Sequence, residues 1–148
     1  MYGKWFECKV LLTRTLENGL QKRVKEIYIV DAMSCTEAES RVVEELKAYC
    51  NDDARPISIK CCEANEIVDS HNPSDGFWYK VKLSMISIDE SAGKEKKVNV
   101  VYYVRAKDFK SALANTESYM SGSVMDYTVV SITETSIMEV FEYKKLPE

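Results

Sequence analysis

The stretches "WFECKV" at residues 5–10 and "WYKVKL" at residues 78–83 both begin with tryptophan and alternate between apolar and polar side chains. Trp5 and Trp78 lie 73 positions apart. From Gly19 and Gly93 onward the matching positions lie 74 apart, and beyond the expected helices the separation returns to 73. Both changes fall in expected loops, where insertions are tolerated. The sequence therefore predicts a tandem duplication.

Each half has the pattern of a β-β-α-β(β) unit. In the first half, alternation predicts two strands, and Asn18-Gly19 suits the turn of a hairpin between them. Ser34 and Glu37 have the spacing of a capping box at the start of a helix. The first half is expected to have strands at 4–14, 22–32 and 56–62, a helix from Ser34 and an extended piece near 66–69. The second half is expected to have strands at 77–88, 97–106, 127–133 and 137–143, and a helix capped by Asp108 that ends near residue 120.

The expected side-chain faces follow from the same periodicities. The helices should turn an apolar stripe inward, which consists of Ala38, Val42, Leu46 and Tyr49 in the first, and of Phe109, Ala112, Leu113, Thr116 and Met120 in the second.

The expected fold is therefore of the α+β class, with an antiparallel sheet and two helices, and with the halves related by a pseudo-twofold axis. Residues 1–148 are interpreted as a single domain with repeat one at 4–70, a linker at 71–76, repeat two at 77–143 and a short tail at 144–148. One unit alone is small for stable folding, so the two are expected to join sheet to sheet or to pack face to face.

The composition is typical of a soluble protein, with 45% apolar and 30% charged residues. The net charge of −4 argues against strong binding to duplex DNA, which usually requires a basic face. The 5 cysteines are odd in number and form no C-x-x-C pair, so we expect reduced thiols with no disulfide and no metal. No signal-like or membrane-spanning apolar run is evident, which predicts a cytoplasmic protein without membrane contact.

The outer face of the second hairpin combines aromatic and basic residues, a combination that suits single-stranded nucleic acid. The candidate binding residues are Trp78, Lys80, Lys82, Lys97, Tyr103 and Arg105. The first repeat is a weaker candidate, because Glu7 and Asp31 stand where the second repeat has Lys80 and Arg105. The competing interpretation is that these mixed faces are packed, since they also contain apolar residues.

Signatures of catalysis are missing from the sequence. There is no nucleophile-elbow pattern and no glycine-rich phosphate loop. The single histidine, His71, lies in the expected linker. Glu66 and Glu139 recur at equivalent positions, for which a structural role is favoured over a two-carboxylate active site. We therefore expect no catalytic residues, no cofactor and no enzymatic activity.

From Trp5 to Tyr143 the chain resembles a family of small proteins of unknown function from Bacteroides-group bacteria and their phages and mobile elements. The resemblance is carried by "WFECKV", "VDAMSCTEAE" (30–39), "WYKVKLSMISIDESAGKEKK" (78–97) and "SITETSIMEVFEY" (131–143). It implies a phage or prophage setting and supplies no activity and no site residues.

The leading functional hypothesis is a non-enzymatic, phage- or mobile-element-associated protein that binds single-stranded nucleic acid. One alternative is an anti-defence or interaction factor that binds a host or phage protein. The other is a small-molecule binder that sequesters nucleotides in a pocket between the repeats. An open face around Trp78, Lys80 and Lys82 would favour nucleic acid, and a buried one would favour either alternative.

Overall fold

The computed structural model describes residues 3–48 and 53–143, which form two compact units. The first unit contains the chain up to Cys62 and the segment from Ser136 onward, and the second is Glu63–Thr135. The described residues form two helices and two four-stranded sheets, in which most neighbouring strands are antiparallel. The prediction of an α+β fold with two helices is confirmed.

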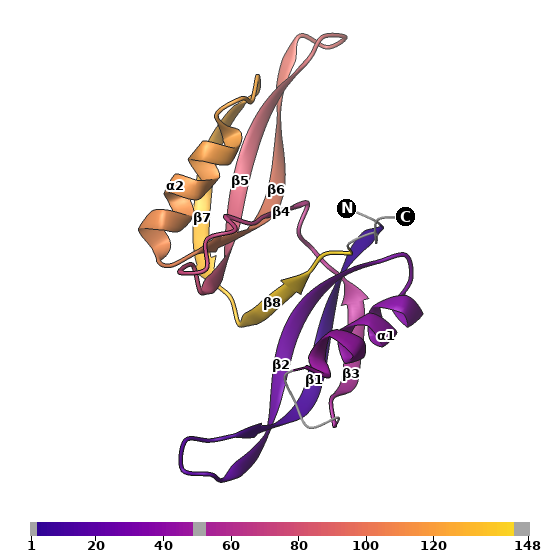
Figure 1. The fold of residues 1–148 in the computed structure, drawn as a ribbon. Helices are drawn as coiled ribbons and strands as arrows, with labels where there is room; N and C mark the ends of the chain where they lie inside the picture. The colour runs from indigo at the N-terminus through magenta and orange to yellow at the C-terminus, as the bar shows by residue number, and fades with distance from the viewer. Residues whose placement is uncertain (1–2, 49–52, 144–148) are drawn as a thin grey trace, which may run out of the picture. The chain divides into compact units, whose positions relative to one another are not determined.

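The first sheet has the strand order β3-β1-β2-β8, and helix α1 packs on it (Figure 1). Its elements are β1 (Lys4–Thr15), β2 (Gln21–Ala32), α1 (Cys35–Leu46), β3 (Arg55–Cys61) and β8 (Ile137–Phe141). Alternate residues of β1 and β2 are buried beneath the helix, as their spacing requires. The core residues of this unit are Phe6, Cys8, Val10, Leu12, Tyr28, Val30, Ala32, Ala38, Val42 and Leu46.

The second sheet has the strand order β4-β6-β5-β7, and helix α2 packs on it. Its elements are β4 (Glu66–Val68), β5 (Phe77–Asp89), β6 (Lys94–Ala106), α2 (Phe109–Met120) and β7 (Asp126–Glu134). Its buried core residues on the helix side are Val68, Tyr79, Val81, Leu83, Tyr102, Val104, Ala106, Ala112 and Met120.

Local sequence explains the turns and helix starts. Gly19 and Gly93 adopt positive φ angles of 82° and 62° in the two hairpin turns, a conformation in which glycine has no steric penalty. The Ser34 side chain accepts a hydrogen bond from the backbone N–H of Glu37 at the start of α1. At the start of α2, Asp108 and Ser111 form a reciprocal capping box. Both helices therefore begin where the sequence predicts.

The short strands β4 and β8 pair outside their own sequence repeats. β8 lies beside β2 of the first sheet, and β4 lies beside β6 of the second, both in parallel orientation. Glu139 stands opposite Tyr28, and Glu66 stands opposite Tyr102, so the two exchanged strands have equivalent registers. The expected antiparallel pairing is found among the long strands, and β4 and β8 depart from it by pairing in parallel. Each unit is completed by a strand from the other half of the sequence.

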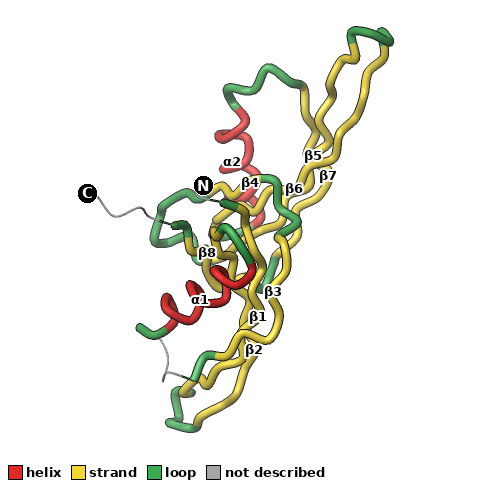
Figure 2. The backbone as a smooth tube through the Cα atoms, turned by 90° about the vertical axis from the view of Figure 1, so that its right-hand side faces the viewer, coloured by secondary structure: helices red, strands yellow, loops and turns green. Residues whose placement is uncertain are grey.

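Both long hairpins extend past their neighbouring strand. β3 pairs with β1 only between Phe6 and Leu11, and β7 pairs with β5 between Tyr79 and Ile86. The ends of the hairpins beyond these pairs are two-stranded ribbons, whose loops are visible in green in Figure 2.

Two expectations about α2 need correction. Phe109 and Leu113 were expected to face inward, but they are 50% and 36% exposed. The buried stripe of this helix is narrower and consists of Ala112, Thr116 and Met120, because positions 109 and 113 fall at its rim. In the first unit, Tyr49 of the expected stripe lies outside the described residues, as does Cys50.

Candidate functional site

The aromatic residues of the expected nucleic-acid face are buried. Trp78 is 2% exposed and Tyr103 is 3% exposed. The Arg105 guanidinium lies 5.9 Å from the centre of a Trp78 ring, and the backbone oxygen of Trp78 accepts a hydrogen bond from the Thr135 hydroxyl at 2.7 Å. Neither Trp78 nor Tyr103 presents a ring face to solvent on which a base could stack.

The Lys80 ammonium, next to Tyr103, already has an acidic partner. Lys80 Nζ lies 2.8 Å from Glu63 Oε1, and the Tyr103 hydroxyl donates to the same oxygen at 3.3 Å. Glu63 therefore offsets the charge that was expected to contact a phosphate. Its position before β4 places it beside β6, which carries Tyr103.

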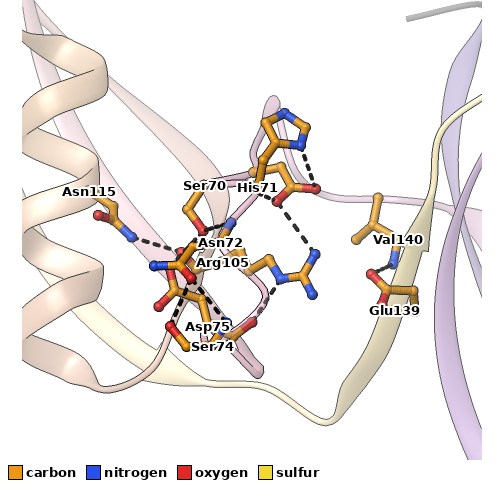
Figure 3. A network of polar contacts seen from close by, with 10 residues as sticks. Ser70, His71, Asn72, Ser74, Asp75, Arg105, Asn115, Glu139 and Val140 are labelled. Atoms are coloured by element: carbon orange, nitrogen blue, oxygen red, sulfur yellow. Dashed lines mark hydrogen bonds and ion pairs between the residues drawn. The ribbon is translucent and has the colours of Figure 1, made fainter.

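Arg105 is held by the loop between β4 and β5. Its Nε donates to the backbone oxygen of Asp75 at 2.8 Å, and its Nη1 lies 3.5 Å from Asp69 Oδ1 (Figure 3). The loop is itself fixed, because the Ser70 hydroxyl donates to the buried Asp75 carboxylate at 2.6 Å. Asn115 of α2 donates to the backbone oxygen of Arg105 at 2.9 Å. This network holds the loop that was expected to be a linker. The Arg105 guanidinium makes its hydrogen bond and its ion pair within the second unit.

Lys82 and Lys97 are the exposed members of the expected set. Lys82 is opposite Val101 on β6, four positions along that strand from Lys97, so the two side chains start roughly 13 Å apart. The structure thus brings Trp78, Lys80, Tyr103 and Arg105 into polar or ring contacts and leaves two separate lysines at the surface. By the criterion stated above, a buried Trp78 favours a binding mode other than base stacking on this face.

A pocket of about 210 Å³ lies in the first unit, on the helix side of the sheet. We call it the Arg14 pocket, and its lining residues are Arg14, Tyr28, Leu46, Met138, Glu139 and Phe141. Three of them come from the first sequence repeat, and three come from β8 of the second. The exchange of β8 into the first sheet therefore builds one wall of this pocket.

A compact polar cluster forms one side of the Arg14 pocket. Arg14 Nη2 lies 2.6 Å from Glu26 Oε1, and Arg14 Nε donates to both Glu26 oxygens at 3.1 and 3.3 Å. The Tyr28 hydroxyl donates to Glu26 at 2.9 Å and accepts from Arg14 Nη2 at 3.2 Å. The Tyr28 ring stacks on Phe141, with 5.5 Å between centroids and an interplanar angle of 10°. The cluster holds both the guanidinium and the aromatic pair in place.

The electrostatics keep Arg14 and Tyr28 each in one protonation state near neutral pH. The pKa of Arg14 is raised, chiefly by its hydrogen bonds to Glu26. The pKa of the Tyr28 hydroxyl is raised by burial first and by the hydrogen bond to Glu26 second. Arg14 is therefore a permanent cation, and Tyr28 is a neutral donor.

The second unit lacks this polar pair at the equivalent positions. Cross-strand register matches Arg14 with Ser87 and Glu26 with Val100, because Arg14 stands opposite Lys22 as Ser87 stands opposite Lys96. The tyrosine is retained as Tyr102, which meets Tyr119 edge-on at 5.7 Å. A sheet of this topology therefore forms without the Arg14–Glu26 pair, so the fold does not by itself explain that pair.

Sequence reasoning missed the Arg14 pocket, although one signal for it was present. Arg14 and Glu26 occupy positions whose neighbours Leu12 and Val24 point toward the helix, and charged residues at inward positions are unusual. Their convergence with Phe141 could not be inferred, because it depends on the exchange of β8.

Thiol and metal chemistry have little support among the described side chains. Cys8, Cys35, Cys61 and Cys62 are free thiols, and burial raises the pKa of Cys8 to about 12, which suppresses its thiolate. Across the described ranges, no group of three or more His, Cys, Asp or Glu side chains is placed to hold a metal ion. Neither α1 nor α2 is long and apolar enough to cross a membrane.

These features define an α+β protein with two helix-covered sheets and a small, partly polar pocket in the first of them. The chain belongs to the family described as Domain of unknown function (DUF4494), whose model matches residues 4–143. No curated protein and no solved structure matches the chain.

Proposed function

We propose that this protein is a non-enzymatic binding protein that takes a small organic ligand in the Arg14 pocket. The observation that carries this proposal is the Arg14–Glu26–Tyr28 cluster beside the Tyr28–Phe141 ring pair. Taking a charged pair partly out of water costs desolvation free energy that can exceed the attraction between the charges, and the equivalent positions in the second unit are the uncharged Ser87 and Val100. The presence of a charged cluster at positions where the second sheet has uncharged residues supports a role in binding.

The test uses the second unit as a template for a control that should fold. The double variant Arg14→Ser/Glu26→Val replaces both residues by those at the equivalent positions of the second sheet, so it removes both charges together. Arg23→Ser is the matched control, because it removes an arginine from the same hairpin whose ion pair, with Asp53 at 3.2 Å, does not line the pocket. Ligand-observed NMR with thymidine, benzoate and benzamidine should detect at least one probe bound to the wild type and to Arg23→Ser, but not to the double variant. Equal binding of every probe to the wild type and the double variant, or no binding of any probe, would reject the proposal.

A second candidate function is binding of single-stranded nucleic acid, which the exposure of Lys82 and Lys97 favours. Its test is binding of oligo-dT at about 50 mM salt, where phosphate contacts are strong. The double variant Lys82→Glu/Lys97→Glu should weaken that binding and leave the other properties of the protein unchanged. Absence of binding by the wild type at this salt concentration would eliminate this candidate.

We also propose that the chain arose by tandem duplication. The β-bulges at Lys9/Val10 and Lys82/Leu83 support this origin, because they fall at equivalent positions of β1 and β5. The equivalent registers of β4 and β8 support it independently. A pseudo-twofold relation between the halves stays a prediction, which superposition of the two halves in a crystal structure would test.

The biological setting remains that implied by the resemblance. We propose a cytoplasmic protein encoded by a phage or mobile element of Bacteroides-group bacteria. Genes for integration or phage assembly should flank its gene, and isolated chromosomal copies without such neighbours would argue against this setting.

A further inference from the structure

We propose that the Arg14 pocket recognises a neutral, planar nitrogen heterocycle of the nucleobase type, free or in a nucleoside, in preference to a phosphate-bearing nucleotide. This inference rests on the proposed function, and it assigns the class of ligand to that site.

The size and walls of the pocket suit a small planar ring. Its volume of about 210 Å³ is below the roughly 300–1,000 Å³ of pockets that hold drug-sized ligands. Leu46 and Met138 supply apolar and thioether contacts, and the half-buried Phe141 ring, which stacks on the buried Tyr28, supplies aromatic surface. Planar rings gain from such surroundings both by burial and by ring–ring and sulfur–ring contacts. One heterocycle therefore fits this space better than a larger ligand.

Arg14 retains hydrogen-bonding capacity toward a ligand. A guanidinium has five N–H donors, and the contacts of Arg14 with Glu26 and Tyr28 use Nε and Nη2. The two N–H groups of Nη1 take no part in those contacts. They can donate to a carbonyl oxygen or a ring nitrogen, which are the acceptors that nucleobases carry on their edges.

The charges of the polar cluster do not favour an anionic ligand. The positive charge of Arg14 is offset by Glu26, whose Oε1 lies 2.6 Å from Arg14 Nη2. A phosphate carries about −1.5 to −2 charges at pH 7, and the Arg14–Glu26 ion pair leaves no net positive charge to attract it. A neutral ring with an acceptor on its edge can bind Arg14 without needing such a charge.

The test compares thymidine with thymidine 5′-monophosphate by titration calorimetry on the full chain. We expect thymidine to bind, and the monophosphate to bind about tenfold more weakly or worse. Arg14→Ser/Glu26→Val should weaken thymidine binding by about tenfold or more, the range expected for loss of a hydrogen bond to a charged group. Arg23→Ser should leave it unchanged. Equal or tighter binding of the monophosphate would overturn the inference.

Two further arms separate failure of this inference from failure of the proposed function. If benzoate or benzamidine binds in an Arg14-dependent way and thymidine does not, the pocket is a binding site and the nucleobase assignment is wrong. Met138→Trp provides a second blocking variant in case the double variant does not fold, since Met138 is 49% exposed at the pocket and tolerates a larger side chain. Thymidine binding that survives Met138→Trp would overturn the inference. Oligo-dT that binds more tightly than thymidine, and that depends on Arg14, would overturn the preference for a ligand without phosphate.

Discussion

Burial determines what Trp78 does for the protein. Its side chain is 2% exposed, whereas Lys82 on the same strand is exposed. Truncation of a buried tryptophan typically costs about 3–5 kcal/mol of folding free energy, because apolar contacts are lost and a cavity remains. We therefore expect Trp78→Ala to lower the free energy of unfolding by that amount, as measured by urea denaturation.

Lys82→Ala is the matched control, because an exposed lysine should change stability by no more than about 0.5 kcal/mol. A Trp78→Ala protein as stable as Lys82→Ala would show that the ring is exposed in solution, and the stacking hypothesis for this face would then regain its basis.

Asp108 makes the stability of the second unit depend on pH in the acid range. Its pKa is lowered from the ordinary value of 3.8, chiefly by hydrogen bonds from the backbone and side chain of Ser111. Because the folded pKa lies below the unfolded one, this carboxylate stabilises the fold above about pH 4, and the contribution is lost as the pH falls through the folded pKa. Asp108→Asn keeps an N-capping side chain without the charge.

The melting temperature of the wild type should therefore fall more steeply than that of Asp108→Asn between about pH 5 and pH 2.5. Parallel curves for the two proteins over this range would mean that the cap does not depend on the ionised form.

Among the elements, the exchanged strands β4 and β8 matter most, because β8 forms one wall of the Arg14 pocket. Phe141 of β8 packs against the core of the first unit, and Val68 of β4 belongs to the core of the second. We expect Phe141→Ala to increase amide hydrogen exchange in β1, β2 and α1, because the lost contacts belong to that unit.

Val68→Ala is the matched variant in the other sheet and should increase exchange in β5, β6 and α2. The reverse pattern, with Phe141→Ala loosening the second sheet, would show that each short strand pairs within its own sequence repeat.

The sequence was sufficient to place the elements but not to assign the partners of the short strands. Alternation, the Asn18-Gly19 turn and the caps at Ser34 and Asp108 are local signals, and the observed elements begin and end within a few residues of the expected positions. Glu66–Val68 and Ile137–Phe141 carry similar patterns, so either strand suits the edge of either sheet. Local periodicity cannot distinguish between two equivalent edges, and the pocket that depends on this choice was therefore not predictable.

A similar reason explains the burial of Trp78. Alternation assigns Trp78 to one face of a strand, but it does not report whether that face is covered. The same limit applies to Lys80 and Arg105, whose acidic partners Glu63 and Asp69 come from the segment that precedes the second repeat.

For the molecule as a whole, the central claim is that the Arg14 pocket binds a small, neutral, planar ligand. The most direct measurement is a crystal structure of the wild-type protein grown with thymidine. We predict ligand density between Arg14 and Phe141, with the base within hydrogen-bonding distance of Arg14 Nη1. Thymidine that binds in solution but lies elsewhere in the crystal, for example against Lys82 or Lys97, would contradict the claim, as would an empty pocket at saturating thymidine.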